Sequence, residues 1–249
     1  WGRIYPKADW APRPLRAKTT LQALACDDVE AYFHSVSITS AAMRQQLYSP
    51  ALKRELRGYS ALTVFRAHAD RAPTDHPLLL SQYLDFKTWL PGDILTKVDR
   101  ASMAHSLEVR VPLLDHRLVE WASSLPPALK LKGSTGKYVL KKALERDLPH
   151  DVIYRTKMGF SVPLSTWLRG PLAKRAREAL LDGTVAKCGY FESSMLERLV
   201  REHTAGRRDH GATLWSLLML DAFLRRMQEP AAAATGKAES KALAAGILS

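Results

Sequence analysis

Apolar residues recur at spacings of three and four along most of this chain, as they do on one face of an α-helix. No segment alternates strongly between apolar and polar residues, so we predict a mainly α chain. A further helix is expected to start at Asp93. The other expected helices span, in order, residues 18–36, 39–47, 50–57, 60–71, 76–89, 116–125, 137–148, 171–182, 192–204 and 211–227.

Residues 93–115 contain the most informative pattern. Ile94, Leu95 and Val98 lie on one face of the expected helix, whereas Asp93, Lys97 and Arg100 lie on another. Two interpretations stay open at this point. These charges can form a site, or Asp93–Lys97 can be an ordinary surface pair that stabilises the helix by about 0.2–0.5 kcal/mol.

The segment after this helix also carries charges of both signs. Glu108 and Arg110 alternate with apolar residues before Pro112, and they line a site or form a structural ion pair. Asp115 is predicted to cap the next helix.

Helix-breaking residues and segments of unusual composition predict where the helices and the parts of the chain begin and end. Residues 76–89 are apolar nearly all round and predict a buried helix that ends at 90–92, where a proline and a glycine follow each other. Residues 1–17 are rich in proline and arginine and predict an irregular connector. Residues 18–229 form the predicted helical part, and residues 230–249 predict a disordered tail.

The composition narrows the function classes. The chain of 249 residues has a formal net charge of +12, which favours an anionic partner such as a nucleotide or pyrophosphate. The cations are scattered without a basic and aromatic repeat, so we predict no nucleic-acid partner. No apolar run is long enough for a membrane span. Cys26 and Cys188 are too few for a disulfide framework or a zinc site, which fits a reducing, cytoplasmic location.

Several familiar sites are not supported. The sequence contains neither GxSxG nor GxGxxG, and the glycine-bearing loop 130–136 lacks the spacing of a phosphate-binding P-loop, so an ordinary turn is expected there. His150 and His210 are predicted to be satisfied surface histidines. Trp121, Trp167 and Trp215 are predicted to belong to the core. The loop 155–160 brings two cations, Arg155 and Lys157, beside a glycine, and it either reaches an anion or is an exposed basic loop.

Linked motifs in this order resemble one family. They read LPxDILxKxDRxSMA over 90–104, SLExRxPxLD over 106–115, GK at 136–137 and RxKxGF over 155–160. The chain resembles the C-terminal synthetase domain of glutamine-hydrolysing asparagine synthetase and its relatives. The match is close from residue 78 to residue 169, and the segment GATLWSLLMLDAFLRR over 211–226 also suits that family.

The resemblance implies a fold, a reaction and partners. The chain would be the C-terminal helical portion of an α/β domain of the adenine-nucleotide α-hydrolase type. That domain would use ATP and Mg²⁺ to adenylate the side-chain carboxylate of aspartate, and ammonia from an N-terminal glutaminase domain would then displace AMP to give asparagine. A homodimer is a further expectation.

The same resemblance assigns the candidate site residues. Lys157 matches the family lysine that contacts pyrophosphate and the reacting phosphate, and it is the predicted catalytic residue. Lys97 and Arg100 are candidates for phosphate or carboxylate contacts, and Glu108 and Arg110 for lining the pocket. These cations suit adenylation because negative charge develops on the phosphates during that reaction and cations stabilise it. We predict no metal ligand in this chain.

Departures from the family pattern leave alternatives open. The chain lacks the family's SGGxDS loop, its acidic GDGxDE segment and its glutaminase cysteine, and it begins at Trp1. We therefore expect a fragment that does not make asparagine by itself. The alternatives are another acceptor, as in surface-polysaccharide biosynthesis, a non-catalytic helical interaction module derived from the fold, and a nucleic-acid-binding helical domain.

Overall fold

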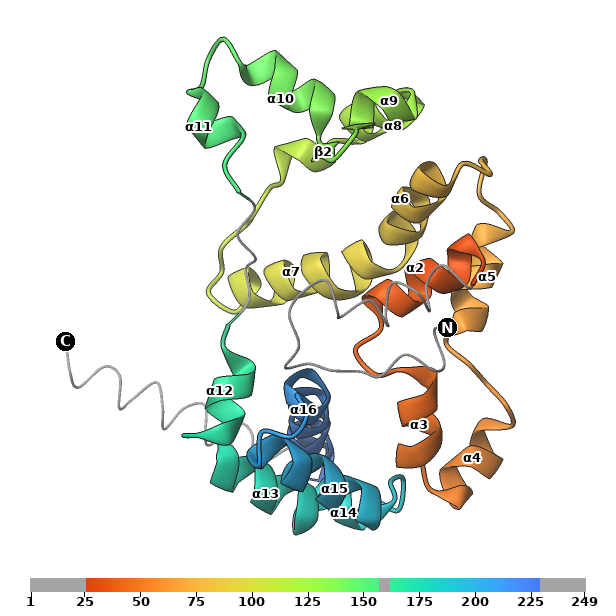
Figure 1. The fold of residues 1–249 in the computed structure, drawn as a ribbon, viewed down its shortest axis with the longest axis vertical. Helices are drawn as coiled ribbons and strands as arrows, with labels where there is room; N and C mark the ends of the chain where they lie inside the picture. The colour runs from red at the N-terminus through yellow and green to blue at the C-terminus, as the bar shows by residue number, and fades with distance from the viewer. Residues whose placement is uncertain (1–25, 157–161, 229–249) are drawn as a thin grey trace, which may run out of the picture. The chain divides into compact units, whose positions relative to one another are not determined.

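The computed structural model describes residues 26–156 and 162–228 (Figure 1). The expected connector 1–17, the expected tail from residue 230 onward, the first part of the expected helix 18–36 and Lys157 lie outside the described residues. The described chain packs into two compact units, residues 26–36 with 60–156 (unit 1) and residues 37–59 with 162–228 (unit 2). The division of the chain at residues 17 and 229 therefore stays a prediction.

Unit 2 is built around one long helix, α16 (Gly211–Gln228). Helices α12, α13 and α14 pack against α16, and α15 packs against α12, α13 and α16. Leucines of these helices supply most of the buried core, including Leu180, Leu196, Leu199 and Leu214. The surrounding helices are α3 (Ala41–Leu47), α4 (Pro50–Leu56), α12 (Leu164–Arg169), α13 (Ala173–Leu181), α14 (Thr184–Lys187) and α15 (Ser193–Thr204).

The junction of α3 and α4 is tied to the segment before α15. Ser49 caps α4 by accepting the Leu52 N–H at 3.2 Å, and its own hydroxyl donates to the Gly189 carbonyl at 2.7 Å. Tyr48 and Phe191 form an isolated antiparallel bridge. The predicted cap at Ser49–Pro50 is therefore confirmed, and the same residue also makes a tertiary contact.

The first half of unit 1 contains α2 (Asp28–Val36), α5 (Leu62–Ala69) and α6 (Pro77–Lys87), which pack against one another. Phe33 is buried and meets Phe65 edge to face at 5.1 Å. Leu80 and Leu84 are the buried residues of α6, whereas Phe86 is exposed. Residues 78–85 are all buried or half-buried, whereas the last two residues of α6 are exposed, so the prediction of a helix buried all round holds only for its middle.

The predicted break after α6 is present, but it lies at Thr88 and not at residues 90–92. The backbone stays helical through a π-helical segment, η2 (Leu90–Leu95), and continues into α7 (Thr96–Met103). The irregularity falls at Thr88, with φ −126° and ψ −73°, before the proline. The Thr96 hydroxyl donates to the Pro91 carbonyl at 2.7 Å, so a side chain satisfies this carbonyl. A widened turn thus accommodates a proline that an ordinary α-helix would not.

The second half of unit 1 is made of short elements. They are η3 (Pro112–Leu114), α8 (His116–Ser124), α9 (Pro127–Lys130), the antiparallel pair β1 (Leu131–Lys132) and β2 (Thr135–Gly136), α10 (Tyr138–Leu144) and α11 (His150–Ile153). Asp115 caps α8 as predicted, accepting the Arg117 N–H at 3.0 Å. The loop 130–136 is a tight hairpin turn, as expected, with Gly133 at φ +58°.

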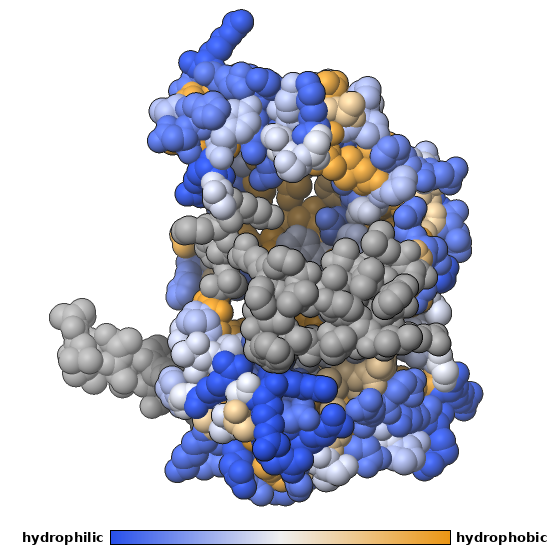
Figure 2. Space-filling model, in the orientation of Figure 1, coloured by the Kyte–Doolittle hydropathy of each residue, from blue (hydrophilic) through white to orange (hydrophobic). Residues whose placement is uncertain are grey.

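Apolar side chains of this second half lie at the surface. No residue from 85 to 156 is fully buried, and Trp121 is 56% exposed, which contradicts its predicted place in the core. Trp167 in unit 2 is also exposed, whereas Trp215 packs against the core as predicted. Figure 2 shows apolar surface around α8 and α9. In the described part of the chain, no helix combines the length and apolar character that crossing a membrane requires.

Candidate functional site

The cations predicted from the central helix lie on α7. Lys97 faces Asp93 with 4.0 Å between Nζ and Oδ1, and both side chains are more than half exposed. Arg100 lies one turn later, is exposed and forms no ion pair with a described residue. Ion pairs this exposed contribute about 0–1 kcal/mol, so the Asp93–Lys97 contact holds Lys97 only weakly. The ammonium group of Lys97 is therefore available to another anion.

A local motif sets the direction of the chain after α7. Ser106 adopts the left-handed conformation with φ +55°, and its N–H donates to the Met103 carbonyl at 3.0 Å. The Leu107 N–H donates to the Ser102 carbonyl, also at 3.0 Å. These two bonds form a Schellman motif, which ends a helix in a defined direction. The segment 107–111 therefore leaves α7 along a fixed path.

Glu108 and Arg110 form a close ion pair on this segment. Arg110 Nε lies 2.7 Å from Glu108 Oε1, with side chains 85% and 71% exposed respectively. Among the described residues, no ion pair or hydrogen bond connects this pair with Lys97 or Arg100. The structure thus places the four described site residues at the surface of unit 1 without joining them. Lys97 pairs with Asp93, Glu108 pairs with Arg110, and Arg100 forms no ion pair with a described residue.

The basic loop belongs only partly to the described chain. Arg155 is described and exposed, whereas Lys157 lies outside the described residues. His150 stacks on Tyr154 with ring centroids 4.5 Å apart and is exposed, as predicted for a surface histidine.

Two cavities occur in unit 2, and none of the predicted site residues lines either of them. The larger, of about 420 Å³, lies between α3, α4 and α16, with Leu47 and Leu217 among its walls. The smaller, of about 200 Å³, lies beside Asp221 and Gly183. The described candidate cations lie outside both cavities, at exposed positions on unit 1.

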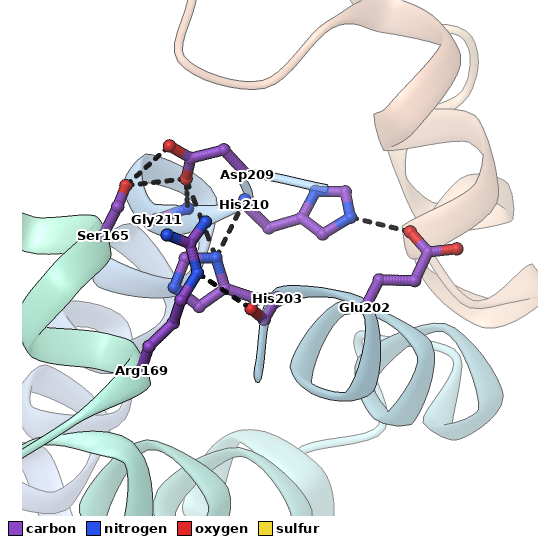
Figure 3. A network of polar contacts seen from close by, with 7 residues as sticks. All are labelled: Ser165, Arg169, Glu202, His203, Asp209, His210 and Gly211. Atoms are coloured by element: carbon purple, nitrogen blue, oxygen red, sulfur yellow. Dashed lines mark hydrogen bonds and ion pairs between the residues drawn. The ribbon is translucent and has the colours of Figure 1, made fainter. Parts of the chain in front are cut away.

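A polar network that the sequence patterns did not predict joins α12, α15 and the start of α16 (Figure 3). The Ser165 hydroxyl lies 2.7 Å from both carboxylate oxygens of Asp209, which also accepts the Gly211 N–H at 2.9 Å. His203 is fully buried, and its Nδ1 accepts the His210 N–H at 3.1 Å. The only signal in the sequence was polar residues clustered between two helical patterns.

Charges in this network shift the pKa values of its members. Hydrogen bonds from Arg198 and then His210 lower the pKa of Glu202 to about 2. Burial, followed by the positive charge of Arg169, lowers the pKa of His203. Burial alone raises the pKa of Asp209, but hydrogen bonds and nearby cations outweigh it, so the net shift is downward.

The geometry of this network indicates a structural role and not a catalytic one. A nucleophilic serine needs its hydroxyl proton within reach of a histidine nitrogen. Here Ser165 donates to Asp209, and His203 uses Nδ1 to accept a backbone N–H. His210 is buried and lies 2.8 Å from Glu202 Oε2, so the prediction that it is satisfied holds and the prediction that it lies at the surface is wrong. The network fixes three helix ends.

Comparison with known proteins identifies the family. The family model described as asparagine synthase matches residues 6–225. Glutamine-hydrolysing asparagine synthetase 1 of Bacillus subtilis is 31% identical over 208 residues, which are 84% of this chain and 32% of that protein. Asparagine synthetase 3 of the same organism is 48% identical over 69 residues, 28% of this chain and 11% of that protein.

A human protein belongs to the same set. Human glutamine-hydrolysing asparagine synthetase is 29% identical over 142 residues, 49% of this chain and 24% of that protein. The chain thus spans about a third of the length of the first of these relatives. No solved structure matches the chain. Together with the mainly helical fold, which confirms the predicted fold class, the family model shows that this chain belongs to the asparagine synthase family.

Proposed function

We propose that this chain is the helical part of the synthetase domain of a glutamine-dependent amidotransferase. In the proposed reaction, a carboxylate oxygen of aspartate attacks the α-phosphorus of ATP and pyrophosphate leaves. Ammonia then attacks the activated carbonyl carbon, AMP leaves, and the nitrogen loses a proton to give asparagine. The observation that carries this proposal is the family match over residues 6–225.

The described cations suit the charge that this reaction develops. Lys97 and Arg110 are held only by exposed ion pairs with Asp93 and Glu108, so exchanging these partners for a phosphate costs little. Preorganised cations near the departing pyrophosphate stabilise the transition state, because negative charge grows there. Lys157 keeps its proposed role as the catalytic lysine from its place in the RxKxGF motif.

The described residues differ in whether they can bind the phosphates of ATP and whether they can bind Mg²⁺. Mg²⁺ prefers several oxygen ligands in an octahedral arrangement. Among the described residues, no group of three carboxylates lies close enough together for this. The described residues therefore do not fit Mg²⁺, and we assign them no step that runs through it. In the proposed enzyme its ligands, like the glutaminase domain that supplies ammonia, come from other parts of the parent protein. A cytoplasmic location and a homodimer stay predictions.

The test is ATP–pyrophosphate exchange by the full-length parent protein in the presence of aspartate. Lys157→Ala should lower the exchange rate by about 100-fold or more, the size typical of losing one group that stabilises transition-state charge. Lys97→Met and Arg110→Met should lower it at least about tenfold, since each removes one such cation. Lys174→Met is the matched control, because Lys174 also forms an exposed i,i+4 pair, with Glu178 at 3.8 Å.

The outcomes separate the alternatives. Exchange that all three variants leave intact would contradict the site assignment while leaving the family in place. Exchange with a different carboxylate but not with aspartate would indicate another acceptor. A parent protein without exchange on any carboxylate would favour the non-catalytic interaction module. The isolated chain should show no exchange, and measurable activity would refute that expectation.

A further inference from the structure

Three side chains, one just before α2 and two on it, bring together different metal-binding atoms. Glu30 and His34 lie one turn apart on the same side of α2, and Cys26 lies two residues before the helix begins. The thiol sulfur, a carboxylate oxygen and an imidazole nitrogen all lie within 4.8 Å of one another. Within residues 26–156 and 162–228, these form the one group of three potential ligands that lies this close.

The neighbouring charges hold this arrangement in place. Asp27 accepts the Glu30 N–H at 2.9 Å, which fixes the first turn of α2. Arg66 of α5 lies 2.8 Å from Asp27 and 3.9 Å from Glu30 Oε2. The other oxygen, Glu30 Oε1, lies 3.6 Å from His34 Nε2. Arg66 thus binds Asp27 closely and makes a longer, weaker contact with the Glu30 oxygen that does not face the histidine.

The ligand set selects the class of metal. A thiolate, an imidazole and a carboxylate suit Zn²⁺, whereas Mg²⁺ and Ca²⁺ prefer oxygen ligands. Bonds of about 2.0–2.3 Å in a tetrahedron require donor atoms about 3.5 Å apart. The three donor atoms lie within 4.8 Å of one another, so the side chains have to move closer together for a metal to bind. Glu30 and His34 are about one-third exposed, so an ion can enter from solvent and keep a water as fourth ligand.

The charge of Glu30 also favours a cation at this place. Its carboxylate lies close to the Cys26 thiol and attracts a divalent ion. A metal binds the thiolate, so the thiol releases its proton as the metal–sulfur bond forms.

We propose that Cys26, Glu30 and His34 form a Zn²⁺ site along one side of α2. This site lies outside the proposed adenylation chemistry, which uses none of the three residues. It differs from the sequence-based prediction of no metal ligand, because spacing alone did not show that the three donor atoms converge. Zinc bound here ties Cys26 to the side of α2 and stabilises the start of that helix.

Cobalt is the spectroscopic probe for the test, because Co²⁺ replaces Zn²⁺ and is coloured. Titration of the chain with Co²⁺ should give visible bands of a tetrahedral site and a near-ultraviolet sulfur-to-cobalt charge-transfer band, both saturating at one equivalent. Addition of Zn²⁺ should remove them. Binding in weakly buffered solution should release about one proton for each metal ion.

Matched variants identify the ligands. Cys26→Ser should abolish the charge-transfer band, and His34→Gln should weaken Co²⁺ binding by about tenfold or more, as loss of a metal partner commonly does. Cys188→Ser, which removes the other cysteine, should leave the spectrum unchanged. Far-UV circular dichroism of each variant verifies its fold. A chain that gives no tetrahedral spectrum, or a charge-transfer band that survives Cys26→Ser or disappears with Cys188→Ser, would overturn the proposal.

Discussion

Asp221 offers the sharpest test of how unit 2 is held together. It lies in the middle of α16 with no exposed surface, yet it carries a carboxylate. Its Oδ1 accepts the Val185 N–H at 3.1 Å, and its Oδ2 lies 2.6 Å from the guanidinium of Arg225. Gly183, which precedes α14, has no side chain to cap that helix. Asp221 therefore caps α14 from another helix, which satisfies an N–H that the helix itself cannot.

The expected cost of Asp221→Ala follows from these contacts. Losing the cap leaves the buried Val185 N–H without its acceptor, which costs about 1–3 kcal/mol. Arg225 is half exposed, so the broken ion pair costs less than the about 3–5 kcal/mol of a fully buried pair. We expect a loss of about 2–4 kcal/mol in the free energy of unfolding. Asp221→Asn keeps an oxygen acceptor and should lose about 1–2 kcal/mol.

Urea unfolding at pH 7, followed by circular dichroism, measures this difference, and hydrogen exchange of peptides from α14 locates it. The matched control is Glu178→Ala, which removes the acid of an exposed i,i+4 pair and should change stability by less than about 0.5 kcal/mol. An Asp221→Ala variant as stable as the control would refute the capping argument. So would an Asn variant that loses as much as the Ala variant, because the acceptor oxygen would then have no role.

Three further changes test other parts of the structure. Ser106 has a left-handed backbone conformation that glycine adopts without strain. Ser106→Gly should therefore stabilise the end of α7 by about 0.5–1 kcal/mol, which slower hydrogen exchange in its last turn would show. Gly211→Ala would put a Cβ 2.6 Å from Ser165 Oγ and should lower the free energy of unfolding by about 1–3 kcal/mol, partly recovered by adding Ser165→Ala. The folded-state pKa of Glu202, about 2, is below its ordinary value of 4.5, so its stabilising effect is present above pH 4.5 and is lost as the pH falls toward 2. Glu202→Gln should flatten the pH dependence of unfolding in that window, and an unchanged slope would contradict the assignment.

The helices of this chain could be predicted because each leaves a local signal. Ser49 before Pro50 and Asp115 before α8 cap their helices as predicted, since capping depends on residues within one turn. The break at Pro91 could not be predicted correctly. How the backbone passes this proline depends on a distortion at Thr88 and on the hydroxyl of Thr96, and neither leaves a periodic pattern in the sequence. The burial of α6 and Trp121 was overpredicted for a related reason, because periodicity shows which face is apolar and not whether a partner covers it.

The residues of the candidate site could be predicted from the sequence, whereas the polar network of unit 2 could not. The four described residues were found from charge spacing and motif resemblance, and the structure places all of them at the surface. Their pairing within 93–97 and 108–110 followed from spacing. By contrast, the network around Asp209 joins residues from positions 165 to 211, and three helices must fold together before it exists.

The site-bearing part of unit 1 is positioned by local devices rather than by a core. No side chain from residue 85 to residue 156 is fully buried, so packing alone does not fix where Glu108 and Arg110 point. What fixes them is the left-handed turn at Ser106 on one side and the Asp115 cap on the other. Such devices stabilise a segment by about 1 kcal/mol each, far less than a packed core. The side chains of Glu108 and Arg110, which are both mostly exposed, are therefore held weakly, and their positions can change at little cost in free energy.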